Sequence, residues 1–137
     1  EVLIEQMIRG TEVTASIIGD NSPEVLPLIE ITSETGVYDY QSKYTPGLSH
    51  HLIPPRLPEA VQVRAKAECL RAYQAVGCRG YSRVDCIVDE KGQPFVLEVN
   101  TAPGMTGTSL FPDAAAAAGM EFTELIRRLI ESARTGY

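Results

Sequence analysis

The stretch that decides the fold runs from Gly80 to Leu110 and reads GYSRVDCIVDEKGQPFVLEVNTAPGMTGTSL. Two β-prone runs, 83–88 and 93–99, flank the turn sequence Asp-Glu-Lys-Gly at 89–92, and this order predicts a β-hairpin. Successive side chains of a strand point to opposite faces, so alternation separates an apolar face from a polar one. The apolar face is expected to pack on the core, and its residues are Val84, Cys86, Val88, Phe95, Leu97 and Val99.

The polar face of this hairpin carries Arg83, Asp85, Glu98 and Asn100. A two-residue turn pairs Asp85 with Glu98, a four-residue turn pairs Arg83 with Glu98, and both registers keep all four groups on one face. Carboxylates gathered in this way repel each other unless a cation lies between them, and oxygen ligands suit Mg²⁺. The pattern therefore predicts a magnesium site. The simpler alternative is a solvated hairpin face on which Arg83 neutralises the carboxylates.

A glycine- and hydroxyl-rich loop, residues 101–109, follows the second strand and leads to Pro112, a residue typical of a first helical turn. Free backbone N–H groups at a helix N-terminus attract anions. The loop contains neither of the glycine patterns that mark P-loops and dinucleotide sites, so by itself it is a weak signal for phosphate. Its place directly after the carboxylate-bearing strand makes an anion site more specific.

The rest of the chain surrounds this hairpin with further strands and helices. The patterns predict strands at 2–8, 12–18 and 25–31, and helices at 58–77, 112–118 and 121–134. No internal repeat or interdomain linker interrupts them. This order predicts the α+β class, an antiparallel β-sheet with helices packed on one side.

One long stretch, residues 33–56, has little periodicity and contains three tyrosines and a lysine. A loop of this length in a compact domain is usually functional, so we expect a lid or a binding loop. His50 and His51 lie within it and are expected to be solvated, because adjacent residues seldom chelate the same metal ion.

Composition excludes several classes of function. The 137 residues include 18 acidic and 12 basic ones, a net charge of −6, which argues against general binding to nucleic acids or anionic membranes. No run approaches the roughly 20 apolar residues that cross a bilayer. The three cysteines cannot all pair within the chain and form no C-x-x-C motif, so a reducing compartment is the simplest expectation.

The order R-x-D, hairpin, L-E-V-N-T-x-P-G-M-T-x-x-S-L resembles the D-alanine–D-alanine ligases of the ATP-grasp superfamily. The run VLIEQMIRGTEVTASI at 2–17 is similar to their adenine-contacting strand and hairpin, and YDYQSKY at 38–44 to their ω-loop. The resemblance covers residues 1 to about 134. It implies that residues 1–137 form a C-terminal ATP-grasp domain with its ω-loop at about 33–56, and that the N-terminal and most of the central domain lie outside this chain.

The resemblance also implies roles for residues of the hairpin and loop. Asp85, Glu98 and Asn100 match the ligands of two Mg²⁺ ions (Mn²⁺ can replace them), with Glu98 shared between the ions. Arg83 matches the arginine that stabilises the transferring phosphoryl group and the tetrahedral intermediate, and the Gly104 N–H matches an oxyanion donor. Ser109 and the Leu110 backbone match the group that binds the carboxylate of the second D-alanine.

A second set of implied roles concerns the nucleotide and the acceptor pocket. Glu5 and the backbone of Gln6, Met7 and Ile8 match the edge that contacts adenine, although an aromatic residue is frequent at the place of Met7. Glu12 matches the partner of the ribose hydroxyls, and Lys43 a residue near the phosphates. Tyr44 matches the tyrosine that shapes the pocket of the second substrate and favours a dipeptide product.

The activity implied is the ATP- and Mg²⁺-dependent ligation of two D-alanines through an acyl phosphate, for peptidoglycan precursors in the bacterial cytoplasm. The family leads us to expect a homodimer, and this segment alone is expected to be inactive. Two alternatives stay open. One is another ATP-grasp carboxylate–amine ligase, with D-lactate or D-serine as acceptor, and the other is a non-catalytic nucleotide-binding module.

Overall fold

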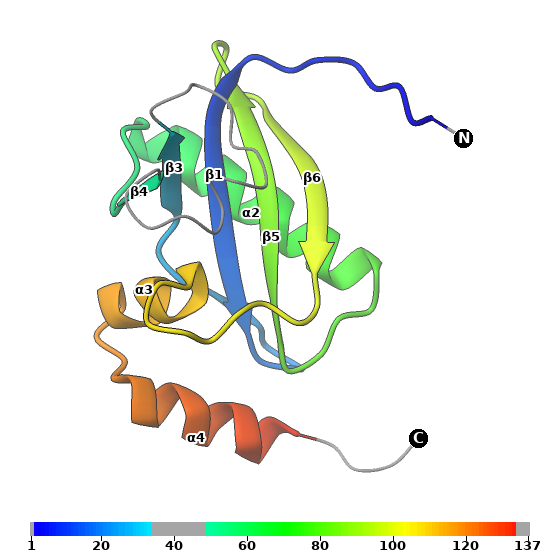
Figure 1. Cartoon of the computed structure of the whole chain (residues 1–137). Coiled ribbons are helices and arrows are strands. Elements are labelled where there is room, and N and C mark those ends of the chain that lie inside the picture. Colours follow the sequence, from blue (N-terminus) through cyan, green and yellow to red (C-terminus); the bar gives the residue numbers. More distant parts are fainter. Residues whose placement is uncertain (1, 34–48, 134–137) are drawn as a thin grey trace.

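The computed structural model of the chain describes residues 2–33 and 49–133. Within these ranges six strands form one sheet in the order β4-β3-β1-β5-β6, with β2 paired to β1, and every neighbouring pair is antiparallel. The strands are β1 (Gly10–Ile18), β2 (Glu24–Val25), β3 (Ile29–Ser33), β4 (Ser49–Leu52), β5 (Tyr81–Asp89) and β6 (Pro94–Asn100). The two longest strands, β1 and β5, lie side by side near the middle of the sheet and form its framework (Figure 1).

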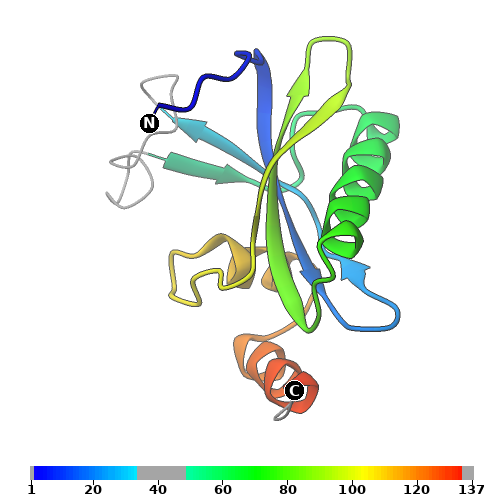
Figure 2. The same cartoon turned by 90° about the vertical axis from the view of Figure 1, so that its right-hand side faces the viewer.

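The helices are α2 (Glu59–Ala75), α3 (Leu110–Ala117) and α4 (Phe122–Ser132). The expected α+β class with an antiparallel sheet is confirmed. The expectation that the helices pack on one side of the sheet is wrong, because α2 packs along one face whereas α3 lies over one end of the opposite face (Figure 2). The alternation of β1 and β3 supplies apolar side chains to both faces, and each face needs its own cover. The middle of that opposite face is therefore left without a covering helix in the described ranges. None of the described helices is long and apolar enough to cross a membrane.

Two apolar clusters correspond to the two faces of the sheet. The first joins α2 to β1 and β5, and its fully buried members include Val13, Ile17, Ala65, Cys69, Tyr73, Val84 and Cys86. The second joins α3 and α4 to β1 and β3, and includes Ile18, Ile29, Ile31, Phe111, Ala114 and Leu125. The alternation Ile17–Ile18 assigns consecutive residues of β1 to different clusters, as the period of a strand requires. Both faces therefore help to hold β1 in place.

The prediction of a first strand at 2–8 is wrong. Residues 2–9 form no strand pairing with any described part of the chain, and Val2, Leu3, Ile4 and Met7 are 80–89% exposed. This segment leaves the end of β1 and extends away from the sheet (Figure 1). Its β-prone composition reflects side-chain type, and a strand forms only where a partner edge supplies hydrogen bonds.

The stretch 33–56, expected to be a loop, contains the strand β4. His50 and His51, both expected to be solvated, belong to this strand, and only His50 is exposed. In β4, His51 lies opposite Ile31 and His50 opposite Thr32. His51 is half-buried, and its Nδ1 lies 2.6 Å from Asp113 Oδ2 of α3. The pair therefore ties the edge strand β4 to the helix that covers one end of the open face.

The hairpin register matches neither simple turn along its whole length. From its open end, Arg83 lies opposite Asn100, and Asp85 opposite Glu98, as a two-residue turn predicts. The pairing then shifts by one residue, so that Cys86 lies opposite Val96. The extra residue is Leu97, and it makes a β-bulge at which the alternation of β6 reverses.

The bulge corrects the face assignment of β6. Val96, expected on the polar face, packs against the first cluster, whereas Phe95 and Leu97, expected in the core, are 37% and 53% exposed. Phe95 lies opposite Ile87 and joins the open face of the sheet. Sequence periodicity alone assumes an uninterrupted strand and cannot register one inserted residue.

Val96→Ala and Leu97→Ala test the bulge directly. Because Val96 packs on the core and Leu97 does not, we expect Val96→Ala to lower the free energy of unfolding by about 1–2 kcal/mol and Leu97→Ala by less than about 0.5 kcal/mol. Urea unfolding of the two variants measures the difference. The reverse order would show that β6 continues without a bulge.

Glu30 makes the stability of the fold depend on pH. Its side chain is buried, and its carboxylate accepts hydrogen bonds from the Arg56 backbone N–H at 2.8 Å and from Arg56 Nη2 at 2.6 Å. Burial raises the pKa of Glu30, but the hydrogen bonds and charge of Arg56 outweigh it and lower the pKa below its usual 4.5. The ion pair therefore stabilises the fold fully above the usual pKa of 4.5. This stabilisation is lost as the pH falls through the lowered pKa of the folded state.

Glu30→Gln is expected to remove part of this acid dependence. Denaturant unfolding of the wild type and the variant between pH 7 and pH 2 measures it, with Glu90→Gln, an exposed turn residue, as the matched control. The free-energy difference between wild type and Glu30→Gln should shrink below about pH 4, because protonation then neutralises the wild-type carboxyl too. A constant difference over the whole range would contradict this account.

Candidate functional site

The open face of the sheet is centred on a buried ion pair in β5. Arg83 Nε donates to Asp85 Oδ1 at 2.9 Å and Arg83 Nη2 to Asp85 Oδ2 at 2.7 Å, a two-point contact. The two side chains are 14% and 7% exposed, so the pair is largely withdrawn from water. They lie two residues apart in a strand, and alternation therefore directs both to the same face.

Glu98 brings a second carboxylate to the same guanidinium. It lies directly opposite Asp85, and its Oε1 is 3.9 Å from Arg83 Nη2. Its side chain is 54% exposed, so this carboxylate faces solvent while Asp85 is held inside. The Arg83 guanidinium therefore lies between two carboxylates, one from β5 and one from β6, and such a pair of carboxylates attracts cations.

β1 adds hydroxyl groups to this face. Thr14 lies opposite Asp85, and Thr14 Oγ1 donates to Asp85 Oδ1 at 2.6 Å. Ser16 lies opposite Arg83, and its buried Oγ has no hydrogen-bond partner among the described residues. Thr14 is not among the site residues that the sequence predicts. Hydroxyls alternate in Thr14-Ala15-Ser16, which indicates that both lie on one face of a strand, but the sequence does not reveal the β1–β5 register that places Thr14 opposite Asp85.

The glycine-rich loop begins where β6 ends. Asn100, opposite Arg83, accepts a hydrogen bond on its Oδ1 from the Ala102 N–H at 3.0 Å. Further along, Ser109 Oγ accepts from the Thr106 N–H at 3.0 Å and lies 2.9 Å from Thr106 Oγ1. These contacts fold the loop back on itself before α3 begins.

Gly104 allows this compact loop. A Cβ at this position would lie 2.8 Å from Ser109 Oγ, closer than non-bonded atoms approach. Ser109 is the N-cap residue of α3, and Leu110 is the first residue of the helix, whose leading N–H groups have no partner within the helix. The structure thus brings Gly104 and Ser109 into contact within one loop, and Leu110 follows directly as the first residue of α3.

The donor set fits a hard divalent cation. Asp85, Glu98 and Asn100 offer only oxygen atoms from neighbouring positions of one face, which suits Mg²⁺ or Mn²⁺ better than a thiophilic metal. Within the described ranges no group of three or more His, Cys, Asp or Glu side chains gathers in a metal-binding cluster. Two carboxylates supplemented by an amide match the small number of protein ligands that Mg²⁺ uses beside water and phosphate oxygens.

The residues predicted to bind the nucleotide are only partly assembled. Glu12 lies on β1 opposite Ile87, on the same face as Thr14 and Asp85. Glu5, Gln6 and Met7 are exposed and Ile8 is half-buried, all in the segment that leaves the sheet. Lys43 and Tyr44 lie outside the described residues.

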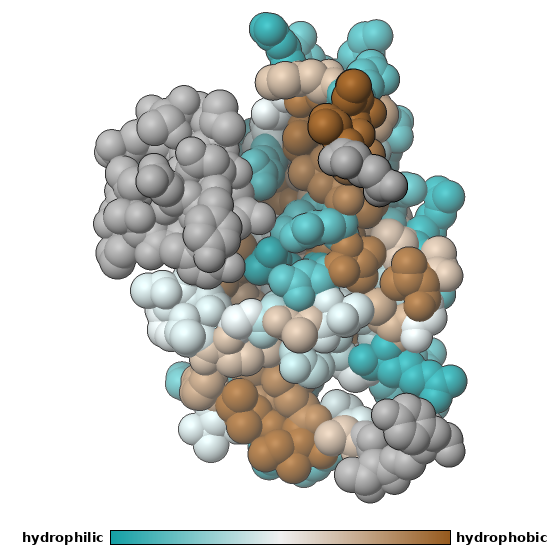
Figure 3. Space-filling view, turned by 45° about the vertical axis from the view of Figure 1, so that its right-hand side comes forward, coloured by the Kyte–Doolittle hydropathy of each residue, from teal (hydrophilic) through white to brown (hydrophobic). Residues whose placement is uncertain are grey.

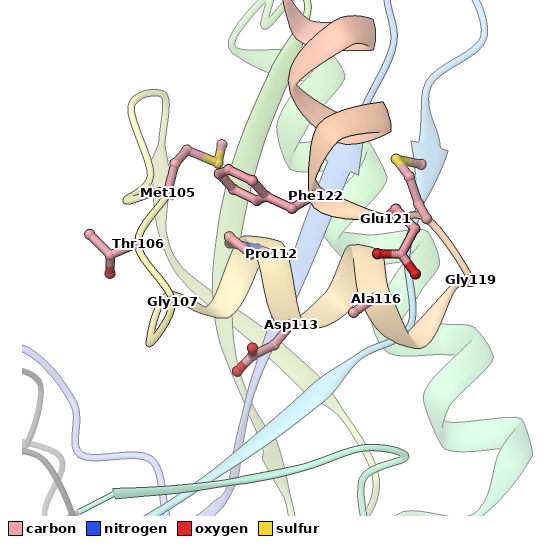
Figure 4. Close-up of a pocket in the computed structure, with 10 residues that line it drawn as sticks. Met105, Thr106, Gly107, Pro112, Asp113, Ala116, Gly119, Glu121 and Phe122 are labelled. Atoms are coloured by element: carbon pink, nitrogen blue, oxygen red, sulfur yellow. The ribbon is translucent and has the colours of Figure 1, made fainter.

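A separate cavity of about 480 Å³ lies behind the loop, between α3 and the start of α4 (Figure 4). Met105 and Phe122 lie beside each other at one end of it, and the carboxylates of Asp113 and Glu121 border it elsewhere (Figure 4). None of the predicted site residues lines this cavity. In space-filling view, hydrophilic groups occupy the middle of the molecule between apolar surfaces above and below (Figure 3).

Comparison with known proteins places these features in a family. A family profile described as "D-ala D-ala ligase C-terminus" matches residues 1–131. The chain is 63% identical over 131 residues to the D-alanine–D-alanine ligase of Pelotomaculum thermopropionicum and 62% identical over 133 residues to that of Desulforamulus reducens. These matches cover 96% and 97% of this chain but only 41% and 42% of the relatives.

Solved structures give the same relationship. The fold resembles the D-alanine–D-alanine ligase of Bacillus anthracis complexed with ATP, with a TM-score of 0.75 and 36% identity over 93% of this chain and 39% of that one. It also resembles the VanG D-Ala:D-Ser ligase of Enterococcus faecalis, with a TM-score of 0.77 and 33% identity over 92% of this chain and 37% of that one.

Removing the two carboxylates is expected to have unequal effects on stability. Asp85→Ala removes the two-point contact of the largely buried Arg83 guanidinium, so we expect the free energy of unfolding to fall by about 3 kcal/mol or more. Glu98→Ala removes an exposed group and should cost less than about 1 kcal/mol. Denaturant unfolding without metal measures both, and equal losses would contradict the structural role assigned to the Arg83–Asp85 pair.

Proposed function

Because this chain belongs to the D-alanine–D-alanine ligase family, of which it spans the C-terminal part, we propose that the protein joins two D-alanine molecules to D-alanyl-D-alanine with ATP. The observation that carries the proposal is the Arg83–Asp85–Glu98 cluster on the open sheet face, on the hairpin from whose last strand residue, Asn100, the glycine-rich loop continues. We propose that it acts together with the upstream part that its relatives possess, and that this segment alone is inactive.

The metal-binding part of the proposal rests on three oxygen-bearing side chains. Asp85, Glu98 and Asn100 would hold two Mg²⁺ ions, with Glu98 shared, and Mn²⁺ would serve in their place. When bound, Mg²⁺ neutralises charge on the phosphate oxygens of ATP. The exposure of Glu98 suits a ligand that reaches a solvent-borne metal–nucleotide, whereas buried Asp85 gives the site a fixed point.

The nucleotide would lie against the open face near the start of β1. Glu12 is directed to this face and would bind the ribose hydroxyls, while Glu5 and the backbone of 6–8 would contact adenine. We further assign Lys43 to the phosphates and Tyr44 to the pocket of the second substrate. The exposed apolar side chains of 2–7 are consistent with a segment that lies between this domain and another.

We propose that Arg83 and the loop take part in a ligation that passes through an acyl phosphate. The γ-phosphoryl group of ATP passes to the carboxylate of the first D-alanine, which gives ADP and an acyl phosphate. The amine of the second D-alanine then attacks the acyl carbon, and phosphate leaves as the peptide bond forms. Arg83 would balance charge on the phosphoryl oxygens, and the Gly104 N–H would donate to the oxyanion of the tetrahedral intermediate.

The second D-alanine needs a group that binds its carboxylate. Ser109 and the Leu110 N–H stand at the N-terminus of α3, where unpaired amide groups and the helix dipole favour an anion. We place the product in peptidoglycan precursor synthesis in the bacterial cytoplasm, and we expect the complete enzyme to be a homodimer. The likeness to a D-Ala:D-Ser ligase favours D-serine as the alternative acceptor.

Glu98→Gln tests the proposal in the complete ligase. It removes one ligand charge, so we expect D-alanine-dependent phosphate release from ATP to fall by about 100-fold or more. Glu90→Gln, in the turn of the same hairpin, is the matched control and should keep wild-type activity.

An acceptor screen with D-alanine, D-serine and D-lactate distinguishes the products. Turnover with D-alanine as the preferred acceptor would support the dipeptide, and preference for D-serine or D-lactate would replace it. If the wild-type enzyme binds ATP but releases no phosphate with any acceptor, the result would contradict the ligase proposal and support a non-catalytic nucleotide-binding module.

A further inference from the structure

Thr14 makes a shorter hydrogen bond to the Asp85 carboxylate than either of the two that Arg83 donates. Its Oγ1 lies 2.6 Å from Asp85 Oδ1, compared with 2.9 Å and 2.7 Å for the two bonds from Arg83. Thr14 is fully buried, and it comes from β1, a different strand from Asp85. The contact therefore fixes the carboxylate to the middle of the sheet, independently of Arg83.

The hydroxyl of Thr14 differs from that of its neighbour Ser16. Both residues are fully buried on β1 and point to the same face, opposite Asp85 and Arg83 respectively. The Thr14 hydroxyl has a hydrogen-bond partner, whereas the Ser16 hydroxyl has none among the described residues. Burial at this face therefore does not by itself give a hydroxyl a partner, and the contact between Thr14 and Asp85 is specific.

A cation bound to Asp85 would weaken the contacts of Arg83 with this carboxylate. Arg83 Nη2 donates a hydrogen bond to Asp85 Oδ2, and a divalent ion at the same carboxylate would repel the positively charged guanidinium. Under the proposed function, Arg83 also interacts with phosphoryl oxygens of the substrate. Both effects favour release of Asp85 by Arg83. Thr14 is neutral and is not repelled by the cation.

We propose that Thr14 is a positioning residue, which holds the Asp85 carboxylate ready for the divalent cation after Arg83 releases it. The inference rests on the proposed function and extends it to a residue that touches neither metal nor substrate. A ligand carboxylate that loses such a hydrogen bond becomes free to rotate, and comparable losses weaken metal binding by about 10–100-fold. The defect should therefore lie in metal affinity and leave D-alanine binding unchanged.

The test uses three variants of the complete ligase. Thr14→Val keeps the branched shape and removes the hydroxyl, Thr14→Ser keeps the hydroxyl, and Ser16→Ala removes the unpartnered hydroxyl two residues away. The measurements are the Mn²⁺ dissociation constant by electron paramagnetic resonance, the Mg²⁺ concentration for half-maximal activity, the KM for D-alanine, and the melting temperature without metal.

We expect Thr14→Val to raise the Mn²⁺ dissociation constant and the half-maximal Mg²⁺ concentration about 10-fold or more, with the KM for D-alanine within about 2-fold of wild type. Thr14→Ser should restore both metal constants to within about 3-fold, and Ser16→Ala should leave them unchanged. A merely structural role for Thr14 would lower the melting temperature without moving the metal constants of the folded enzyme.

Unchanged metal constants in folded Thr14→Val would overturn the role of Thr14. If that variant does not fold, Thr14→Ala is compared with Thr14→Ser, and equal metal constants in these two would overturn it likewise. Wild-type enzyme without D-alanine-dependent phosphate release would instead overturn the proposed function. The two failures are therefore distinguishable.

Discussion

The two-point contact between Arg83 and Asp85 is the interaction on which the candidate site depends. It places a largely buried charged pair on the open face of the sheet, where removal of either partner costs stability. Thr14 anchors this pair to β1, and Glu98 approaches it from β6. Three adjacent strands therefore meet at the Asp85 carboxylate, with Thr14 from β1, Arg83 from β5 and Glu98 from β6.

The architecture around this pair explains why the face stays open. The long helix α2 covers the whole length of the other face through Val61, Ala65, Cys69 and Tyr73. On the side that carries Asp85, α3 and α4 pack over one end only, and the loop from β6 to α3 begins at Asn100, opposite Arg83. A ligand that binds here meets the strands directly.

Much of this arrangement could be predicted from the sequence, because it follows from the period of a strand. Alternation in 83–85 and 98–100 directs the charged groups to one face in both of the registers considered, and the structure pairs Asp85 with Glu98 accordingly. The helix at 58–77 was equally predictable, since its apolar spacing and its limits at Pro58 and Gly77 are local signals.

The remaining features depend on contacts between distant parts of the chain. The bulge at Leu97 inserts one residue that no periodicity reveals, and it exchanges the faces of Phe95 and Val96. The segment 2–8 has the composition of a strand but no partner in the described chain, and Thr14 acquires its role only through the register of β1 with β5. The contact of His51 with Asp113 likewise joins residues far apart in the chain, so the sequence alone does not predict it.

The most direct test of the account is to locate bound Mn²⁺ in the complete ligase with ATP, by the paramagnetic broadening of backbone amide signals. The account predicts selective broadening at Arg83–Asp85 and at Glu98–Asn100, the two stretches that face each other across β5 and β6. Broadening centred on His50 and His51, with the signals of Asp85 and Glu98 unaffected, would contradict it.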